Sequence, residues 1–218
     1  MSKSKDFFNM VTVGDSKAGK TSLLCALKDG KLTDQEIPEF FQTFTHNIKV
    51  DGRKLELGLW DTSGEAKYEG LRRLAYPTCD VFLVCYSVDS RKSFENVTQV
   101  WLPEVKKYGP PKASIIIVGT KLDVRPRTSL SRNGSLGLNS DRPVPKERFV
   151  KFDEGLKLAN EEGAYAFLEC SALSENGVRD VFEQAIRAVL KSEKEEKSKS
   201  KQSRSGSTGL IRSLLPGK

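Results

Sequence analysis

Residues 14–21 carry glycine, lysine and threonine at a spacing that suits phosphate binding. They read Gly-Asp-Ser-Lys-Ala-Gly-Lys-Thr and match the pattern G-x-x-x-x-G-K-[S/T] at every fixed position. Gly14 and Gly19 allow a tight turn, so that successive backbone N–H groups point at phosphate oxygens. Lys20 would place a cation on the β- and γ-phosphates, and the Thr21 hydroxyl would ligate Mg²⁺. The residues predicted to contact a nucleoside triphosphate here are Gly14, Asp15, Ser16, Lys17, Ala18, Gly19, Lys20, Thr21 and Ser22.

The motif Asp61-Thr62-Ser63-Gly64 follows a predicted strand and would act together with this loop. It places Asp61 beside Thr21, where the carboxylate would help to hold Mg²⁺ through a water molecule. Gly64 can bring a backbone N–H to the γ-phosphate. The predicted metal ligands are therefore Thr21 and Asp61.

The segment Thr120-Lys121-Leu122-Asp123 indicates which base is bound. The Asp123 carboxylate can accept hydrogen bonds from guanine N1–H and from its 2-amino group, a donor pair that adenine lacks. Ser171-Ala172-Leu173 follows the last predicted strand and can bring a backbone N–H to the guanine carbonyl. Each motif is weak alone, but in this order, each after a strand, they predict a guanine site formed by Thr120, Lys121, Asp123, Ser171, Ala172 and Leu173.

The elements that must position these motifs alternate along the chain. Hydrophobic patterning predicts strands at residues 7–13, 44–50, 55–61, 81–87, 114–119 and 165–170, and helices at residues 20–29, 67–75, 91–108, 147–162 and 177–191. An Asp51-Gly52 turn makes the second and third strands an antiparallel hairpin. The prediction is an α/β fold with a mostly parallel six-stranded sheet, one antiparallel edge strand and helices on both faces. Ligands then bind at the carboxyl ends of the strands.

The basic character of the chain belongs to its C-terminal end. The net charge is +7, of which residues 191–218 supply +5 through eight Lys or Arg and three Glu. A nucleic-acid partner is therefore not predicted for the rest of the chain. No apolar run approaches the ~18 residues that span a bilayer, and the four cysteines show no paired or metal-binding spacing. A cytoplasmic location is expected.

Taken together, the motifs resemble those of the Ras-like small GTPases, and within them the Rho type. The resemblance runs from about residue 6 to residue 190 and includes LWDT at 59–62, DVFLVC at 80–85, SFENV at 93–97, WLPEV at 101–105 and LECSAL at 168–173. It implies a G domain that binds GTP or GDP with Mg²⁺ and signals, for example to the cytoskeleton, through effector proteins, with exchange factors as further partners. The implied effector and switch residues are Ile37, Pro38, Glu39, Phe40, Phe41 and Trp60. A P-loop kinase is the other option for residues 14–21, but Asp123 would have no role in it.

The chain departs from this family at residues that matter for hydrolysis. Ser16 stands where the family has a small residue, usually glycine, which leaves room for an arginine finger; the side chain of Ser16 would take up part of that room. Glu65 stands where the family has the catalytic glutamine that orients the attacking water. A carboxylate cannot donate a hydrogen bond and places negative charge near the γ-phosphate.

The first switch departs as well. Glu39 aligns with the family's Mg²⁺-binding threonine; it could ligate the metal, although its charge opposes the triphosphate. Leu32 replaces a phenylalanine that stacks on the guanine edge, a loss of about 0.5–1.5 kcal/mol. These changes predict slow GTP hydrolysis that activating proteins do not stimulate. Two alternatives stay open: a GTPase that cycles normally, and a scaffold indifferent to nucleotide. The resting nucleotide is also open, because cellular GTP excess favours GTP whereas Glu39 and Glu65 favour GDP.

The predicted domain organisation is a G domain over residues 1–191 and a basic tail over residues 192–218. An insert of Ser, Arg, Gly and Pro at about residues 125–146 is predicted to be a long loop, and residues 192–209 are predicted to be disordered. No cysteine follows Cys170, so C-terminal prenylation is not expected. The basic tail would support at most weak peripheral contact with the inner membrane surface.

Overall fold

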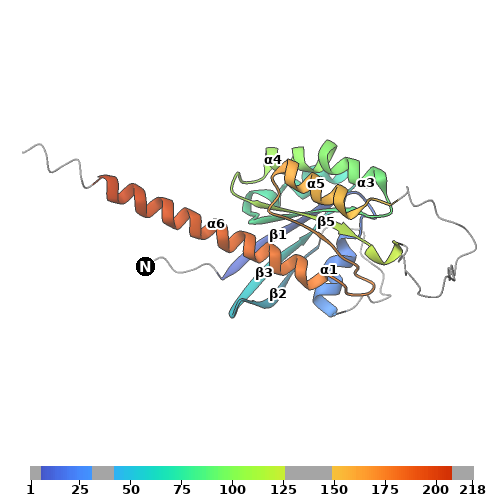
Figure 1. Cartoon of the computed structure of the whole chain (residues 1–218), viewed down its shortest axis with the longest axis horizontal. Helices are drawn as coiled ribbons and strands as arrows, with labels where there is room; N and C mark the ends of the chain where they lie inside the picture. The colour runs from blue at the N-terminus through green and yellow to red at the C-terminus, as the bar shows by residue number, and fades with distance from the viewer. Residues whose placement is uncertain (1–5, 31–41, 126–148, 208–218) are drawn as a thin grey trace, which may run out of the picture.

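The computed structural model describes residues 6–30, 42–125 and 149–207, whose helices and strands are shown in Figure 1. Six strands form one sheet in the order β2-β3-β1-β4-β5-β6. The pair β2–β3 is antiparallel and the other neighbouring pairs are parallel, which confirms the predicted fold class. The strands are β1 (Phe7–Gly14), β2 (Gln42–Val50), β3 (Arg53–Asp61), β4 (Val81–Ser87), β5 (Ser114–Thr120) and β6 (Ala166–Glu169).

Helices cover both faces of this sheet (Figure 1). On one face lie α1 (Lys20–Asp29) and α6 (Val178–Ser207), and on the other α3 (Arg91–Asn96), α4 (Leu102–Tyr108) and α5 (Phe152–Glu162). A π-helical turn, η3 (Val97–Trp101), joins α3 to α4. The remaining short elements are α2 (Glu69–Arg73) and the 3₁₀ turns η1 (Ala66–Tyr68), η2 (Tyr76–Thr78) and η4 (Leu122–Val124).

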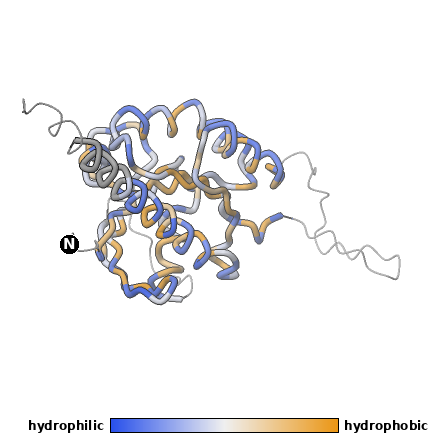
Figure 2. The backbone as a smooth tube through the Cα atoms, turned by 60° about the vertical axis from the view of Figure 1, so that its left-hand side comes forward, coloured by the Kyte–Doolittle hydropathy of each residue, from blue (hydrophilic) through white to orange (hydrophobic). Residues whose placement is uncertain are grey.

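The central strands are apolar because helices bury them from both sides. Every residue of β4 is buried. Figure 2 shows the hydrophobic residues concentrated along the middle of the sheet, with hydrophilic residues over the helices. The sheet therefore separates two hydrophobic clusters, one under α1 and α6 and the other under α3, α4 and α5.

The register of the strands brings the predicted motifs to one edge. Thr12 of β1 lies opposite Asp61 at the end of β3, and Gly14 lies opposite Cys85 of β4. Strand β5 ends at Thr120, where the predicted base-binding segment begins. The motifs thus follow the carboxyl ends of parallel strands, as expected for a ligand site in this fold class.

Three predicted helices besides α6 differ from the observed ones. The helix predicted at residues 91–108 contains the π turn η3, and the one predicted at 67–75 consists of η1 and α2. Helix α5 begins at Phe152 rather than at residue 147. The reason is that the Val150 N–H donates to the Val88 carbonyl (2.9 Å), and the Glu154 carboxylate then accepts from the Lys151 N–H (2.9 Å) and caps the helix.

Helix α6 is longer than predicted, since it continues to Ser207 and projects beyond the sheet (Figure 1). The expectation of disorder is therefore wrong for residues 192–207. The part of α6 up to Leu190 packs on the core, so later residues extend a helix that already exists rather than nucleating one. Their Lys, Glu and Gln side chains also have good helix propensity. Residues 208–218 and most of the predicted insert lie outside the described residues.

Candidate functional site

The loop between β1 and α1 requires glycine at both of its ends. Gly14 has φ 146°, and a Cβ there would lie 2.2 Å from the Cys85 carbonyl oxygen. Gly19 has φ 80° at the start of α1, and a Cβ there would lie 3.0 Å from the Thr120 hydroxyl oxygen. Only glycine, which has no side chain, can therefore adopt the backbone conformation at these two positions without strain or a clash. This geometry agrees with the sequence prediction of a loop that turns tightly against the sheet.

Lys20 lies under this loop with its ammonium group almost fully enclosed. The residue is 6% exposed, and its Nζ donates to the carbonyl oxygens of Gly14 and Asp15, each at 2.8 Å. Burial lowers the pKa of Lys20, although the nearby Asp61 and Asp15 carboxylates partly oppose that shift. A phosphate group bound at the loop would place a negative charge opposite this enclosed cation.

Thr21 and Asp61 form a pair of oxygen ligands suited to a hard cation. The Thr21 hydroxyl donates to Asp61 Oδ2 at 2.6 Å. The other oxygen, Oδ1, is buried and has no hydrogen-bond partner within the described part of the chain. Burial raises the pKa of Asp61, and the Thr21 hydrogen bond and Lys20 oppose this. An orphaned carboxylate oxygen beside a hydroxyl fits Mg²⁺, which commonly combines one or two protein oxygens with water and phosphate.

Among residues 6–30, 42–125 and 149–207, no group of three or more His, Cys, Asp or Glu side chains could hold a metal ion.

Within the same residues, no helix has the length and apolar character to cross a membrane.

Gly64 lies directly against the phosphate-binding loop. A Cβ on Gly64 would come within 2.4 Å of the Ser16 nitrogen and the Gly14 carbonyl oxygen. Glycine is therefore required because the two backbones approach closely. The residue after it, Glu65, is exposed, and its carboxylate pairs with Lys67 Nζ at 2.8 Å on the surface.

The predicted base-binding segments are bonded to the phosphate loop and to each other. The Thr120 hydroxyl donates to the Ala18 carbonyl at 2.6 Å. The Ser171 hydroxyl donates to Asp123 Oδ1, and Lys121, between Thr120 and Asp123, has a left-handed φ of 59°. The structure thus brings together four segments that are far apart in the sequence.

An ion pair that the sequence did not predict supports the end of the site where the base is predicted to bind. Arg125 makes two hydrogen bonds of 2.6 Å to the Glu169 carboxylate and a third to the Val150 carbonyl. It therefore ties the end of η4 to β6 and to the segment before α5. The sequence signal is the placement of opposite charges near the carboxyl ends of two adjacent strands, which is too common to predict a pair.

We expect the substitution Asp123→Asn to weaken GDP binding by about 10- to 100-fold, as expected when bidentate base recognition is lost. The new amide oxygen would still accept a hydrogen bond from Ser171, but the amide NH₂ group would face the N1–H and 2-amino donors of guanine. The variant should instead favour xanthine, which has an acceptor at position 2. Competition between GDP and XDP for a fluorescent GDP analogue measures the change. Asp153→Asn, the same change in an exposed residue of α5, should leave both affinities unaltered. Equal GDP binding by both variants would contradict the role of Asp123.

Several predicted residues are not placed by the structure. Leu32, Ile37, Pro38, Glu39, Phe40 and Phe41 lie outside the described residues. Trp60 is half-buried, and its indole N–H donates to Asn9 Oδ1 at 3.1 Å. Its effector contact stays a prediction. Leu173, in the predicted base-binding segment, is placed by the structure and is 69% exposed.

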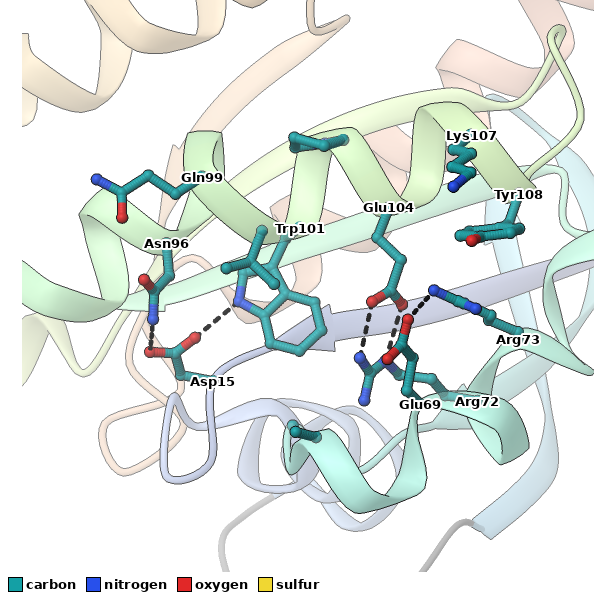
Figure 3. A pocket seen from close by; sticks show the side chains of 14 residues that line it. Asp15, Glu69, Arg72, Arg73, Asn96, Gln99, Trp101, Glu104, Lys107 and Tyr108 are labelled. Carbon is teal, nitrogen blue, oxygen red and sulfur yellow. Dashed lines mark hydrogen bonds and ion pairs between the residues drawn. The ribbon is translucent and has the colours of Figure 1, made fainter.

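Sequence reasoning missed a polar network behind the phosphate loop (Figure 3). The Asp15 carboxylate accepts from Asn96 Nδ2 and Trp101 Nε1, each at 2.7 Å. Beside it, Arg72 of α2 makes two hydrogen bonds, of 2.8 and 2.7 Å, to the buried Glu104 carboxylate of α4. These side chains line a cleft of about 480 Å³ between α2 and the α3–α4 helices. Trp101 is buried, and its N–H has a role that the sequence pattern did not indicate.

Comparison with protein-family models gives a match that covers well over half of the chain. Residues 9–191 match the model described as Ras, Ras family. The matched range contains all of the segments that the structure brings to the edge of the sheet.

Proposed function

Because the chain belongs to the Ras family of small GTP-binding proteins, we propose that it is a Rho-type switch that holds GTP or GDP with Mg²⁺ and hydrolyses GTP slowly. In this proposal residues 14–22 hold the phosphates, and Thr21 and Asp61 hold the metal. Residues 120–123 and 171–173 hold guanine. The bound Mg²⁺ would neutralise charge on the β- and γ-phosphates.

One observation carries this assignment: the motifs are joined by direct hydrogen bonds. Thr120 of the base-binding segment bonds to Ala18 of the phosphate loop, and Thr21 of that loop bonds to Asp61. A base and a triphosphate bound at these positions would therefore span one continuous, internally braced edge of the sheet. Such bracing supports a specific nucleotide site and argues against a scaffold that has lost it.

The Rho-type assignment rests on residues that pack behind the site. The runs SFENV and WLPEV supply Asn96 and Trp101, which contact the phosphate loop, and Glu104, which holds α2. These resemblances support recognition by effectors and exchange factors of Rho type acting at the switch regions. Cytoskeletal signalling is proposed on the family resemblance alone.

Slow hydrolysis is proposed from Ser16, Glu39 and Glu65. Ser16 lies on the exposed side of the phosphate loop, where its side chain would meet an inserted arginine, and Gly64 approaches the Ser16 backbone closely. Glu65 offers no hydrogen-bond donor to an attacking water molecule, and its carboxylate pairs with Lys67. Removal of one well-placed transition-state donor costs ~10²–10³-fold in other enzymes.

We expect the double substitution Ser16→Gly/Glu65→Gln to raise the single-turnover rate of GTP hydrolysis by at least about tenfold. The change restores a donor near the attacking water and removes bulk from the loop. Quantifying GDP formed from preloaded protein over time gives the rate. Glu69→Gln alters another carboxylate of the second switch (residues 65–73), one that pairs with Arg73, and should leave the rate unchanged. A natural rate equal to that of the double variant would instead favour a normally cycling GTPase.

A simple binding measurement tests the alternative of a scaffold that is indifferent to nucleotide. Such a scaffold would show no Mg²⁺-dependent binding of fluorescent GDP.

The nucleotide bound at rest is a separate question. It is GTP if slow turnover and cellular GTP excess dominate, and GDP if Glu39 and Glu65 repel the γ-phosphate. Chromatography of the nucleotide released from purified protein distinguishes these two states.

We further propose that the G domain ends near residue 191. Leu190 is the last core residue that the structure describes on α6, and Lys191 after it is exposed. The basic segment that follows would contact anionic lipid only weakly, and a cytoplasmic location is proposed.

A further inference from the structure

The Asp15 carboxylate is held on the outer side of the phosphate-binding loop. Its Oδ2 accepts from Asn96 Nδ2 and its Oδ1 from Trp101 Nε1, each at 2.7 Å. Figure 3 shows the carboxylate pointing toward these two side chains of the α3–α4 segment. Both oxygens therefore have a donor, although Asp15 is next to Ser16 in a loop whose amides are predicted to face phosphate.

The π turn explains how one helical segment supplies both donors. Asn96 and Trp101 are five residues apart, which in an α-helix would place them about 140° apart around the axis. In η3 the Leu102 N–H donates to the Val97 carbonyl, five residues earlier, so the turn is wider and residues five apart lie on the same side. Pro103 accounts for this widening, because it has no N–H and its ring crowds the carbonyl of Gln99, four residues earlier.

The indole is fixed from behind by the second switch. Trp101 is 2% exposed, and the Arg72 guanidinium lies 5.0 Å from the centroid of its ring. Arg72 also donates to the Glu65 carbonyl at 2.9 Å and pairs with Glu104. The donor to Asp15 thus belongs to a packed unit that includes the residue at the catalytic glutamine position.

We propose that Asn96 and Trp101 are positioning residues of the nucleotide site, which hold the Asp15 carboxylate away from the phosphates and thereby slow nucleotide release. A free carboxylate in this loop would repel the phosphates, by about 1 kcal/mol at 4 Å in water and by more where water is excluded. Two charge-assisted hydrogen bonds prevent this by keeping the side chain outside. The inference rests on guanine-nucleotide binding and does not depend on slow hydrolysis.

Dissociation of fluorescent GDP in the presence of Mg²⁺ tests the inference. Trp101→Phe keeps an aromatic ring beside Arg72 but removes the N–H, and Asn96→Leu keeps the approximate shape but removes the amide donor. Each should speed GDP release about three- to tenfold. Gln99→Leu, in the same helical turn and lining the same cleft without bonding to the loop, should not change the rate.

A second background separates positioning from packing. With Asp15→Ala already present there is no carboxylate to hold, so Trp101→Phe should alter GDP release by less than about twofold. If Trp101→Phe speeds release equally in both backgrounds, or has no effect in the natural background, the proposal is wrong. If the unaltered chain binds no fluorescent GDP, the proposed function fails together with this inference. Thermal unfolding of each variant monitors the fold independently.

Discussion

Lys20→Met is expected to weaken GDP binding by about 10²- to 10³-fold, or about 3–4 kcal/mol. The natural ammonium is enclosed beneath the phosphate loop and donates to two of its carbonyl oxygens at 2.8 Å. Methionine retains the unbranched apolar stem but removes the charge opposite the phosphates. It also leaves the Gly14 and Asp15 carbonyls without that donor, so the loop loses an internal support. Titration of nucleotide-free protein with fluorescent GDP measures the affinity.

Lys17→Met is the matched control for this experiment. Lys17 lies in the same loop, but its side chain is exposed, so its charge acts through solvent. We expect its removal to weaken GDP binding less than about threefold. If the two substitutions have equal effects, the net charge of the loop matters and the enclosed contacts of Lys20 do not. Far-UV circular dichroism should show the same helix and strand content in both variants.

The sequence predicted the parts of the molecule that depend on local pattern. Strand β4 is mostly apolar and buried throughout, and it was assigned with its observed bounds, as was α1 behind the phosphate loop. The site motifs could be read because each has a fixed spacing and follows a strand. The parallel sheet then brings them together, since the carboxyl ends of its strands share one edge.

The parts that were missed depend on partners far apart in the chain. Asp15 and Trp101, like Arg72 and Glu104, form contacts that no local periodicity indicates. Pro103 was a usable signal for the π turn, but the helical pattern around it favoured one continuous helix. The extension of α6 was missed for another reason, because a polar composition does not prevent a helix from continuing once its first part is docked.

Arg72→Met is expected to lower the free energy of unfolding by about 3–5 kcal/mol. The Arg72 and Glu104 side chains are only 4% and 7% exposed, and their charges face each other at 2.7 Å. Removal of the guanidinium leaves a buried carboxylate with the Tyr76 hydroxyl (2.6 Å) as its remaining hydrogen-bond donor among those described. Denaturant unfolding followed by circular dichroism measures the loss. A change below about 1 kcal/mol would show that the pair is not needed for stability.

The same pair should make stability depend on pH. Burial of Glu104 disfavours its ionised form, but hydrogen bonds from Arg72 and Tyr76 outweigh burial, so the pKa of Glu104 lies below its ordinary value of 4.5. A depressed folded-state pKa contributes stability above the unfolded-state value, and this contribution is lost as the pH falls through the folded-state value. The natural protein should therefore lose more stability than Glu104→Gln as the pH is lowered from about 6 to below 4.5. Parallel pH profiles of the two proteins would contradict a depressed pKa.

Two further variants show whether charge or shape holds the second switch in place. Tyr76→Phe removes one hydrogen bond to a carboxylate that keeps its arginine, so it should cost about 1.5–3 kcal/mol, less than Arg72→Met. Arg72→Met/Glu104→Leu replaces both charges by apolar groups of similar size and should recover part of the loss, because no buried charge is left unpaired. The recovery is not complete, because the buried Tyr76 hydroxyl loses its acceptor. The double variant nevertheless lacks the donor to the Glu65 carbonyl and the cation beside Trp101. If it is stable but releases GDP faster than the natural protein, the ion pair serves to position the second switch behind the phosphate loop more than to hold the fold together.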